Sequence, residues 1–150
     1  MPTRLKDFAT SLVAVVEPDS SALAAAQLMR RHHIGALVVV DANEKSRPVG
    51  VLTDRDLVLG LMAEGLDPAL FTVGDIMSVE LVVANPEMDA MDAVQLMCVN
   101  RLRRLVLVND AGQLAGIVTM EDVLELLTRE LASLAVGVLG ARDREFETRK

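Results

Sequence analysis

The sequence is almost free of aromatic residues, because its 150 residues include three Phe and neither Trp nor Tyr. Proteins that bind single-stranded nucleic acid usually stack bases on aromatic rings, so the sequence disfavours a stacking platform of that kind. Any planar ligand would therefore lie between aliphatic side chains. The charge balance agrees, since 22 acidic against 15 basic residues give a net charge of −7, whereas binders of nucleic acid or anionic membranes need a basic surface.

Cysteines, long apolar runs and a leader peptide are also scarce or missing. A single cysteine excludes an intrachain disulfide framework and a cysteine-rich zinc site, and it is typical of a reducing compartment. The longest apolar run, residues 34–40, is far too short to span a bilayer. The first eight residues, MPTRLKDF, lack the apolar core of a signal peptide. We therefore expect a cytoplasmic protein without a nucleic-acid or membrane partner.

The chain does contain an internal repeat. Apolar residues make up 51% of the sequence, enough for one compact domain or for two small domains that share a core. A shift of 68 residues aligns the two halves, and it becomes 66 beyond a polar loop that is two residues longer in the first half. The matched segments are 17–29 with 85–97, 37–40 with 105–108, and 50–56 with 116–122. One length difference, confined to a loop, is what two copies of a supersecondary unit show.

Each copy predicts the same order of elements, β-α-β-β-α. A short strand-like run ends at a proline, and a polar helix start leads into a helix that extends to about His33 or Arg101. An apolar run typical of a buried strand, a polar turn and a third strand follow, and a second helix starts at Thr53 or Thr119. Neither copy alone closes a core, so we expect the two to pack sheet to sheet around a pseudo-twofold axis.

The residues shared by the two copies resemble the CBS domain, and the tandem pair resembles a Bateman module. The most specific mark is Gly-h-h-Thr-x-x-Asp (h, apolar), which occurs as Gly50, Thr53 and Asp56 and again as Gly116, Thr119 and Asp122. The resemblance implies an α/β (α+β) fold of two β-α-β-β-α CBS repeats. We place them at residues 4–65 and 72–130, followed by a helical extension and charged tail over 131–150. The sequence departs from the family at Val38 and Val106, where proline is often found.

The resemblance implies a ligand-sensing regulatory module and not an enzyme. Such pairs bind adenosine nucleotides or related adenosyl compounds in clefts between the repeats, so the candidate ligands are AMP, ADP, ATP and S-adenosylmethionine, none an obligatory cofactor. They also signal to a partner protein and commonly form homodimers. The alternative is a structural or dimerisation module with empty, degenerate clefts. The sequence shows no nucleophile elbow, glycine-rich phosphate loop or paired catalytic carboxylates, so no catalytic residue is assigned.

The two Thr-x-x-Asp pairs have two interpretations that do not exclude each other. Thr53 with Asp56, and Thr119 with Asp122, have the spacing of a capping box. In such a box the Thr oxygen accepts a hydrogen bond from a backbone N–H, and the carboxylate accepts one from the backbone N–H of the Thr. The resemblance implies in addition that each carboxylate accepts hydrogen bonds from ribose hydroxyl groups.

Arg103 and Arg104 concentrate positive charge in an acidic chain. One interpretation is that they stabilise the negative end of the preceding helix, as the basic first-copy segment 30–33 also would. The other is phosphate binding, for which a guanidinium is suited. Their first-copy counterparts are Gly35 and Ala36, so we expect one phosphate-competent cleft and one that takes a neutral adenosyl group or nothing. Adjacent strand residues point to opposite faces, so we expect only one arginine to face the cleft.

Apolar residues near the strand starts are core residues by default, and the resemblance implies that some of them line adenine slots. Adjacent residues on a helix point in different directions, so His32 and His33 do not predict a metal site, and Cys98 is interpreted as a buried residue. The predicted ligand-binding residues are Val13, Val15, Ile34, Gly35, Thr53, Asp56, Leu81, Val83, Leu102, Arg103, Arg104, Thr119 and Asp122.

The apolar helix faces of so small a chain predict a homodimer. The faces expected to be covered carry Leu57, Leu61, Val123 and Leu127, and the stripe Leu131, Leu134 and Val138 extends them. Gly137 and Gly140 are expected to weaken the last helix, and the final ten residues are expected to be solvated and disordered.

Overall fold

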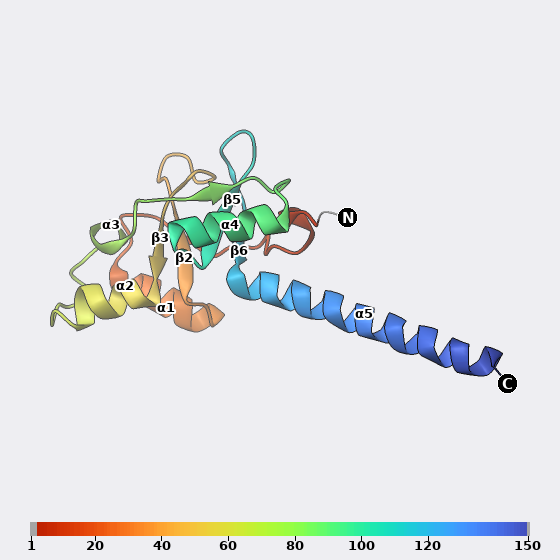
Figure 1. The fold of residues 1–150 in the computed structure, drawn as a ribbon. Helices are drawn as coiled ribbons and strands as arrows, with labels where there is room; N and C mark the ends of the chain where they lie inside the picture. The colour runs from red at the N-terminus through yellow and green to blue at the C-terminus, as the bar shows by residue number, and fades with distance from the viewer. Residues whose placement is uncertain (1–2, 150) are drawn as a thin grey trace.

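The computed structural model describes residues 3–149 and consists of two similar halves and a long C-terminal helix (Figure 1). The first half contains η1 (Leu5–Asp7), β1 (Val15–Val16), α1 (Ala22–His32), β2 (Ala36–Val40), β3 (Pro48–Thr53), α2 (Asp54–Leu57) and η2 (Val58–Met62), a π-helical turn that continues α2. The second half contains α3 (Val73–Ile76), β4 (Val83–Ala84), α4 (Ala90–Asn100), β5 (Arg104–Val108), β6 (Leu114–Thr119) and α5 (Met120–Thr148).

Each half forms one three-stranded sheet, in the orders β1-β2-β3 and β4-β5-β6. The first strand runs parallel to the second and the third antiparallel to it, with the same register in both halves: Val15 lies opposite Val38, and Val83 opposite Val106. The predicted fold of two β-α-β-β-α units is therefore confirmed.

The helix boundaries follow from local polar groups. Ser21 and Asp89 cap α1 and α4 by accepting hydrogen bonds from the backbone N–H groups of Ala24 and Met91. Both helices end one residue earlier than predicted. His33 and Arg101 adopt left-handed backbone conformations with φ of 53° and 55°, which turn the chain into the next strand.

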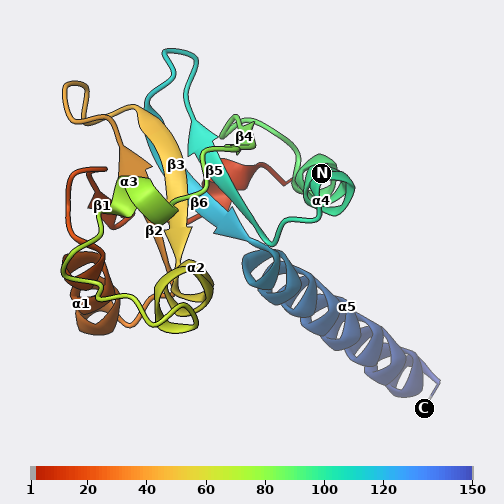
Figure 2. The ribbon, with the colours of Figure 1, turned by 90° about the vertical axis from the view of Figure 1, so that its left-hand side faces the viewer.

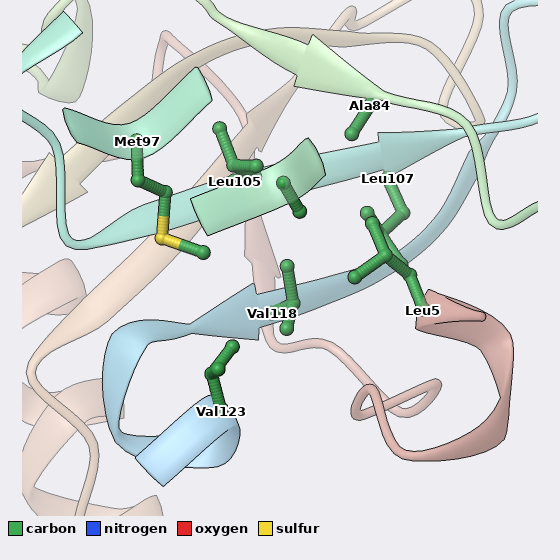
Figure 3. Packing of buried hydrophobic residues seen from close by; sticks show 8 residues of the cluster. Leu5, Ala84, Met97, Leu105, Leu107, Val118 and Val123 are labelled. Carbon is green, nitrogen blue, oxygen red and sulfur yellow. The ribbon is translucent and has the colours of Figure 1, made fainter. Parts of the chain in front are cut away.

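The two sheets pack against each other and cover their outer faces with helices. Along β2 and β5, alternate side chains face the opposite sheet, where Val38 and Val106 lie buried in a shared cluster. The intervening residues face the helices of their own half, as the second-half cluster in Figure 3 shows for Leu105 and Leu107. The sheet-to-sheet packing predicted from the repeat is therefore present.

The two cores exchange their first segments. Leu5, near the start of the chain, is fully buried in the core of the second half (Figure 3), and Val73 is fully buried in the core of the first. The chain after each segment pairs with the third strand of the opposite half: Thr10 bridges to Ile117 of β6, and Ser78 bridges to Val51 of β3. Each core therefore contains one segment from the other sequence repeat.

This exchange explains the glycines of the repeated motif. A Cβ atom on Gly50 would lie 2.5 Å from the backbone oxygen of Ser78, and one on Gly116 would lie 2.7 Å from that of Thr10. Both distances are shorter than any real Cβ contact, so only glycine allows the exchanged segment to cross the strand so closely.

The C-terminal helix α5 projects from the body of the molecule (Figures 1 and 2). It runs unbroken through Gly137 and Gly140 to Thr148, so residues 141–148 of the tail expected to be disordered are helical, and Lys150 lies outside the described residues. Neither glycine has a side-chain neighbour to lose, and each costs only about 1 kcal/mol of helix propensity. Within residues 3–149, no helix combines the length and hydropathy needed to cross a membrane.

The expected dimer faces are only partly available. Leu61 and Val123 are each 2% exposed and pack inside the chain, because the helices that carry them cover the sheets of their own halves. Leu127 and the stripe beyond it on α5 are exposed.

Candidate functional site

Two clefts open between the halves, and each combines the Thr-x-x-Asp motif of one half with the strand-start residues of the other. The Asp56 cleft has a volume of about 170 Å³ and the Asp122 cleft about 270 Å³. The Asp56 cleft is lined by Val51, Thr53, Asp56, Ser78, Glu80, Leu81, Val82, Leu102, Arg103, Arg104 and Val106. The Asp122 cleft is lined by Thr10, Leu12, Val13, Ala14, Ile34, Gly35, Ala36, Arg104, Ile117, Thr119 and Asp122.

The linings correspond position by position through the repeat. Leu81, Val82 and Leu102 form an aliphatic wall in the Asp56 cleft, and their counterparts Val13, Ala14 and Ile34 do so in the other. Both volumes are below the roughly 300–1,000 Å³ of pockets that enclose a drug-sized ligand. A ligand of nucleotide size would therefore leave part of itself in solvent.

The motif residues form the predicted capping boxes. The backbone N–H of Thr53 donates to Oδ2 of Asp56 at 2.8 Å, and the N–H of Asp56 donates to Thr53 Oγ1 at 3.2 Å. The corresponding distances for Thr119 and Asp122 are 2.9 and 3.1 Å. Within residues 3–149, neither Oδ1 atom accepts a hydrogen bond, so each carboxylate keeps one oxygen for a ligand hydroxyl. The cap and ribose interpretations are thus compatible within one geometry.

The two arginines differ in their surroundings. Arg103 is 76% exposed, and its guanidinium pairs with Glu121 at the start of α5. The pKa of Glu121 lies below its usual value, first because of a hydrogen bond from its own backbone N–H and then because of Arg103 and the charge of Arg104. Arg104 is half-buried and makes no ion pair with any residue that the structure describes.

The distribution of these arginines differs from the one expected from the sequence. Both line the Asp56 cleft, although only one was expected to face it. Arg104 also reaches the Asp122 cleft, which was expected to lack a phosphate-binding cation. Gly35 and Ala36 line that cleft as well, and a Cβ atom on Gly35 would lie 2.9 Å from Oδ2 of Asp54.

All but two of the predicted ligand-binding residues line one cleft or the other. The exceptions are Val15, which is 41% exposed and lines a separate hollow on the outer face of the first half, and Val83, which is 40% exposed. Val13 and Val15 would point to the same side only if residues 13–15 all belonged to one strand. β1 begins at Val15 and is two residues long, so Val13 lies outside it. Neither Val15 nor Val83 lines the Asp56 cleft or the Asp122 cleft in this structure.

The exchanged segments supply cleft residues that the sequence did not predict. Thr10 and Ser78 are related by the 68-residue shift, but nothing in the repeat indicated that each crosses to the other half. Val51 and Ile117 had a usable signal, because each stands two residues before the motif Thr on a strand and so shares its face.

No cluster of three or more His, Cys, Asp or Glu side chains that could hold a metal ion occurs among residues 3–149.

Cys98, expected to be buried, is exposed, because the neighbouring Met97 turns towards the sheet instead.

Two curated proteins are similar in sequence to most of this chain. The CBS domain-containing protein YhcV of Bacillus subtilis is 43% identical over 119 residues, which cover 79% of this chain and 81% of YhcV. An uncharacterized protein of Methanopyrus kandleri is 41% identical over 109 residues, and there the match spans 55% of the relative's length, so the chain corresponds to about half of that protein.

Solved structures share the fold. The CBS domain pair of protein MJ0100, in complex with 5′-methylthioadenosine and S-adenosyl-L-methionine, superposes with a TM-score of 0.77 at 23% identity, over 87% of this chain and 99% of that one. Protein PAE2072 from Pyrobaculum aerophilum, complexed with AMP, gives a TM-score of 0.74 at 22% identity, over 84% and 99%.

The profile of the CBS domain matches twice, at residues 5–63 and 73–129, which together cover most of the sequence and contain both Thr-x-x-Asp motifs. With two matched domains and two related sheets in one chain, this protein belongs to the CBS domain family as a tandem pair.

Proposed function

We propose that this chain is a cytoplasmic regulatory module that binds an adenosine nucleotide or a related adenosyl ligand in its clefts and signals to a partner protein. The observation that carries the proposal is that each cleft combines an unengaged carboxylate oxygen, on Asp56 or Asp122, with an aliphatic wall from the opposite half. The carboxylate suits the ribose hydroxyl groups, and the wall suits a base held without aromatic stacking.

Arg103 and Arg104 favour ligands that carry a phosphate group. Arg103 and Arg104 line the Asp56 cleft, where a guanidinium can donate two hydrogen bonds to one phosphate. AMP, ADP and ATP are the candidates for this cleft. Arg104 also lines the Asp122 cleft, so the same nucleotides are candidates there, beside S-adenosylmethionine, which carries no phosphate. The MJ0100 and PAE2072 complexes hold ligands of both kinds, and at 22–23% identity they support the fold rather than the choice of ligand.

The experiment is a thermal-shift and calorimetric panel with AMP, ADP, ATP and S-adenosylmethionine. A ligand at 100 times its Kd adds about 2.7 kcal/mol to stability, which corresponds to roughly 5–10 °C in Tm for a chain of this size. If no ligand raises Tm, the alternative of a structural module with empty clefts is the correct one.

Asparagine variants separate the ribose role from the capping role. Asp56→Asn and Asp122→Asn should each weaken binding to their own cleft by about 1.5–3 kcal/mol, roughly 10- to 150-fold in Kd, and should lower stability less because Asn also caps helices. Asp75→Asn is the matched control: Asp75 forms the same capping box with Thr72 in α3 but lines neither cleft. If all three variants bind as the wild type does, the aspartates are caps only.

We also infer that a second copy of the chain covers α5. Exposed apolar side chains follow the alternating four- and three-residue spacing of a helix–helix seam: Leu124, Leu127, Leu131, Leu134 and Val138. Residues 120–130 carry four acidic residues and one basic residue, whereas residues 142–149 carry three of each, including Arg142, Arg144 and Arg149. An antiparallel pair therefore places the arginines beside the acidic segment, and a parallel pair would place the two acidic segments together.

Light scattering across micromolar concentrations tests this homodimer. Leu134→Glu places a charge in the seam and should yield monomers with an unchanged Tm of the body, because Leu134 is exposed in the single chain. Ser133→Glu adds the same charge outside the seam and should leave the dimer intact. A wild-type monomer at every concentration, or a dimer that survives Leu134→Glu, would refute this use of α5.

A further inference from the structure

Position 104 lies where the two clefts meet. Along β5, Arg104 shares a strand face with Val106, which is buried between the two sheets. Its counterpart on β2 is Ala36, which shares a face with Val38 in the same cluster. The repeat therefore relates one long cationic side chain to a single methyl group.

Among residues 3–149, Arg104 is the one residue that lines both clefts. Among the described residues that line the Asp122 cleft, it is the only basic one. In the Asp56 cleft it stands with Arg103, which Glu121 already engages, and with the carboxylates of Asp56 and Glu80. Its guanidinium makes no ion pair with the residues that the structure describes, so it is available to an anionic ligand in either cleft.

We propose that the Arg104 guanidinium is a single phosphate-binding group shared by the two clefts, so that a phosphate bound in one cleft weakens phosphate binding in the other. This inference rests on the proposed function and adds a coupling between its two sites. Once the Arg104 guanidinium donates its hydrogen bonds to the first phosphate, the second phosphate meets like charge without that guanidinium, and the Asp56 cleft then offers only Arg103, which Glu121 engages. A ligand without a phosphate uses only the aliphatic wall and the carboxylate, and it binds to the two clefts independently.

The coupling has a direct measure. Asp56→Asn leaves the Asp122 cleft as the tight site, and Asp122→Asn leaves the Asp56 cleft, so calorimetry on the two variants gives the affinity of each cleft alone. For independent clefts, the product of these two association constants equals the product of the two stepwise constants of the wild type. For AMP we expect the wild-type product to be lower by about tenfold, within the roughly 5- to 150-fold range of known site-to-site couplings. For adenosine we expect the products to agree.

Arg104→Ala, made in the wild type and in both Asn variants, should abolish the tenfold difference and bring the AMP affinity of the Asp122 cleft close to its affinity for adenosine. Arg103→Ala is the matched control, because Arg103 lines one cleft only: it should weaken AMP in the Asp56 cleft and leave the coupling in place. Unchanged melting without ligand shows that the variants fold.

Ala36→Arg supplies the missing second guanidinium at the related position and should raise the second AMP association constant. Equal products for AMP in the wild type, coupling that is the same for adenosine, or coupling that survives Arg104→Ala would each overturn the shared-arginine proposal while leaving adenosine binding intact. If neither AMP nor adenosine binds the wild type, the proposed function fails, and this inference fails with it.

Discussion

Replacement of Gly50 by alanine tests the exchange of segments between the halves. The new Cβ atom would lie 2.5 Å from the backbone oxygen of Ser78. That oxygen accepts a hydrogen bond from the N–H of Val51 at 3.0 Å, and the N–H of Ser78 donates to the Val51 oxygen at 2.9 Å. Because the obstructing atom belongs to the backbone, relief of the contact requires the whole exchanged segment to move away from β3.

The cost follows from what that movement breaks. Each lost backbone hydrogen bond costs about 0.5–1.5 kcal/mol, and overpacking strain of this kind adds about 1–3 kcal/mol. Gly50→Ala, which threatens two such bonds, should therefore destabilise the protein by roughly 2–6 kcal/mol. At about 2–4 °C per kcal/mol for a chain of this size, Tm should fall by roughly 4–24 °C.

Thermal unfolding followed by circular dichroism measures the effect, and the chain offers its own controls. Gly116→Ala, at the related position, places a Cβ atom 2.7 Å from the Thr10 oxygen and should behave in the same way. Gly137→Ala lies on α5 with nothing within 4 Å, so it should cause no loss of Tm and should gain helix signal. If Gly50→Ala and Gly137→Ala melt within a degree of each other, the close crossing does not stabilise the fold as argued.

Three further predictions concern Leu5, Asp41 and Cys98. Leu5→Ala, although only five residues from the start of the chain, should cost about 2–5 kcal/mol in urea unfolding because Leu5 is fully buried in the second core; a loss below half a kcal/mol would contradict that burial. The hydrogen bond from Arg47 holds the pKa of Asp41 below its usual value in the folded state. The ionised Asp41 therefore stabilises the fold at pH values above its unfolded pKa, and this stabilisation is lost as the pH falls through the folded pKa. Arg47→Ala should move the Asp41 titration seen by NMR to higher pH. Cys98 is exposed and should react with a thiol reagent in the folded protein about as fast as in urea, whereas slow labelling would show that the helix face is covered.

The local structure could be predicted because it depends on neighbours in the sequence. Ser21, Asp89, Thr53 and Thr119 cap helices through groups within three residues, and the apolar runs of β2 and β5 needed no distant information. The eleven predicted residues that do line a cleft stand next to such elements.

The remaining features depend on how the halves meet, which the repeat leaves open. Leu5 could have packed in its own half with no change in the pattern, and only the fold shows that it crosses. Arg104 lines both clefts because of how the halves pack, whereas an alignment of the halves only pairs it with Ala36. The burial of Cys98 was misjudged because one residue of helix register separates a core position from a surface one.

The exchanged segments also bear on how such a chain arises by gene duplication. A single ancestral repeat that gave its first segment to an identical neighbour would have been a segment-swapped dimer of two separate polypeptides. Joining two copies through a short connection such as residues 63–71 makes that swap intramolecular, and the neighbour is then always present at high effective concentration. After fusion the two copies no longer had to remain identical, and arginine at position 104 against alanine at the related position 36 is a difference that an assembly of identical single-repeat chains could not hold.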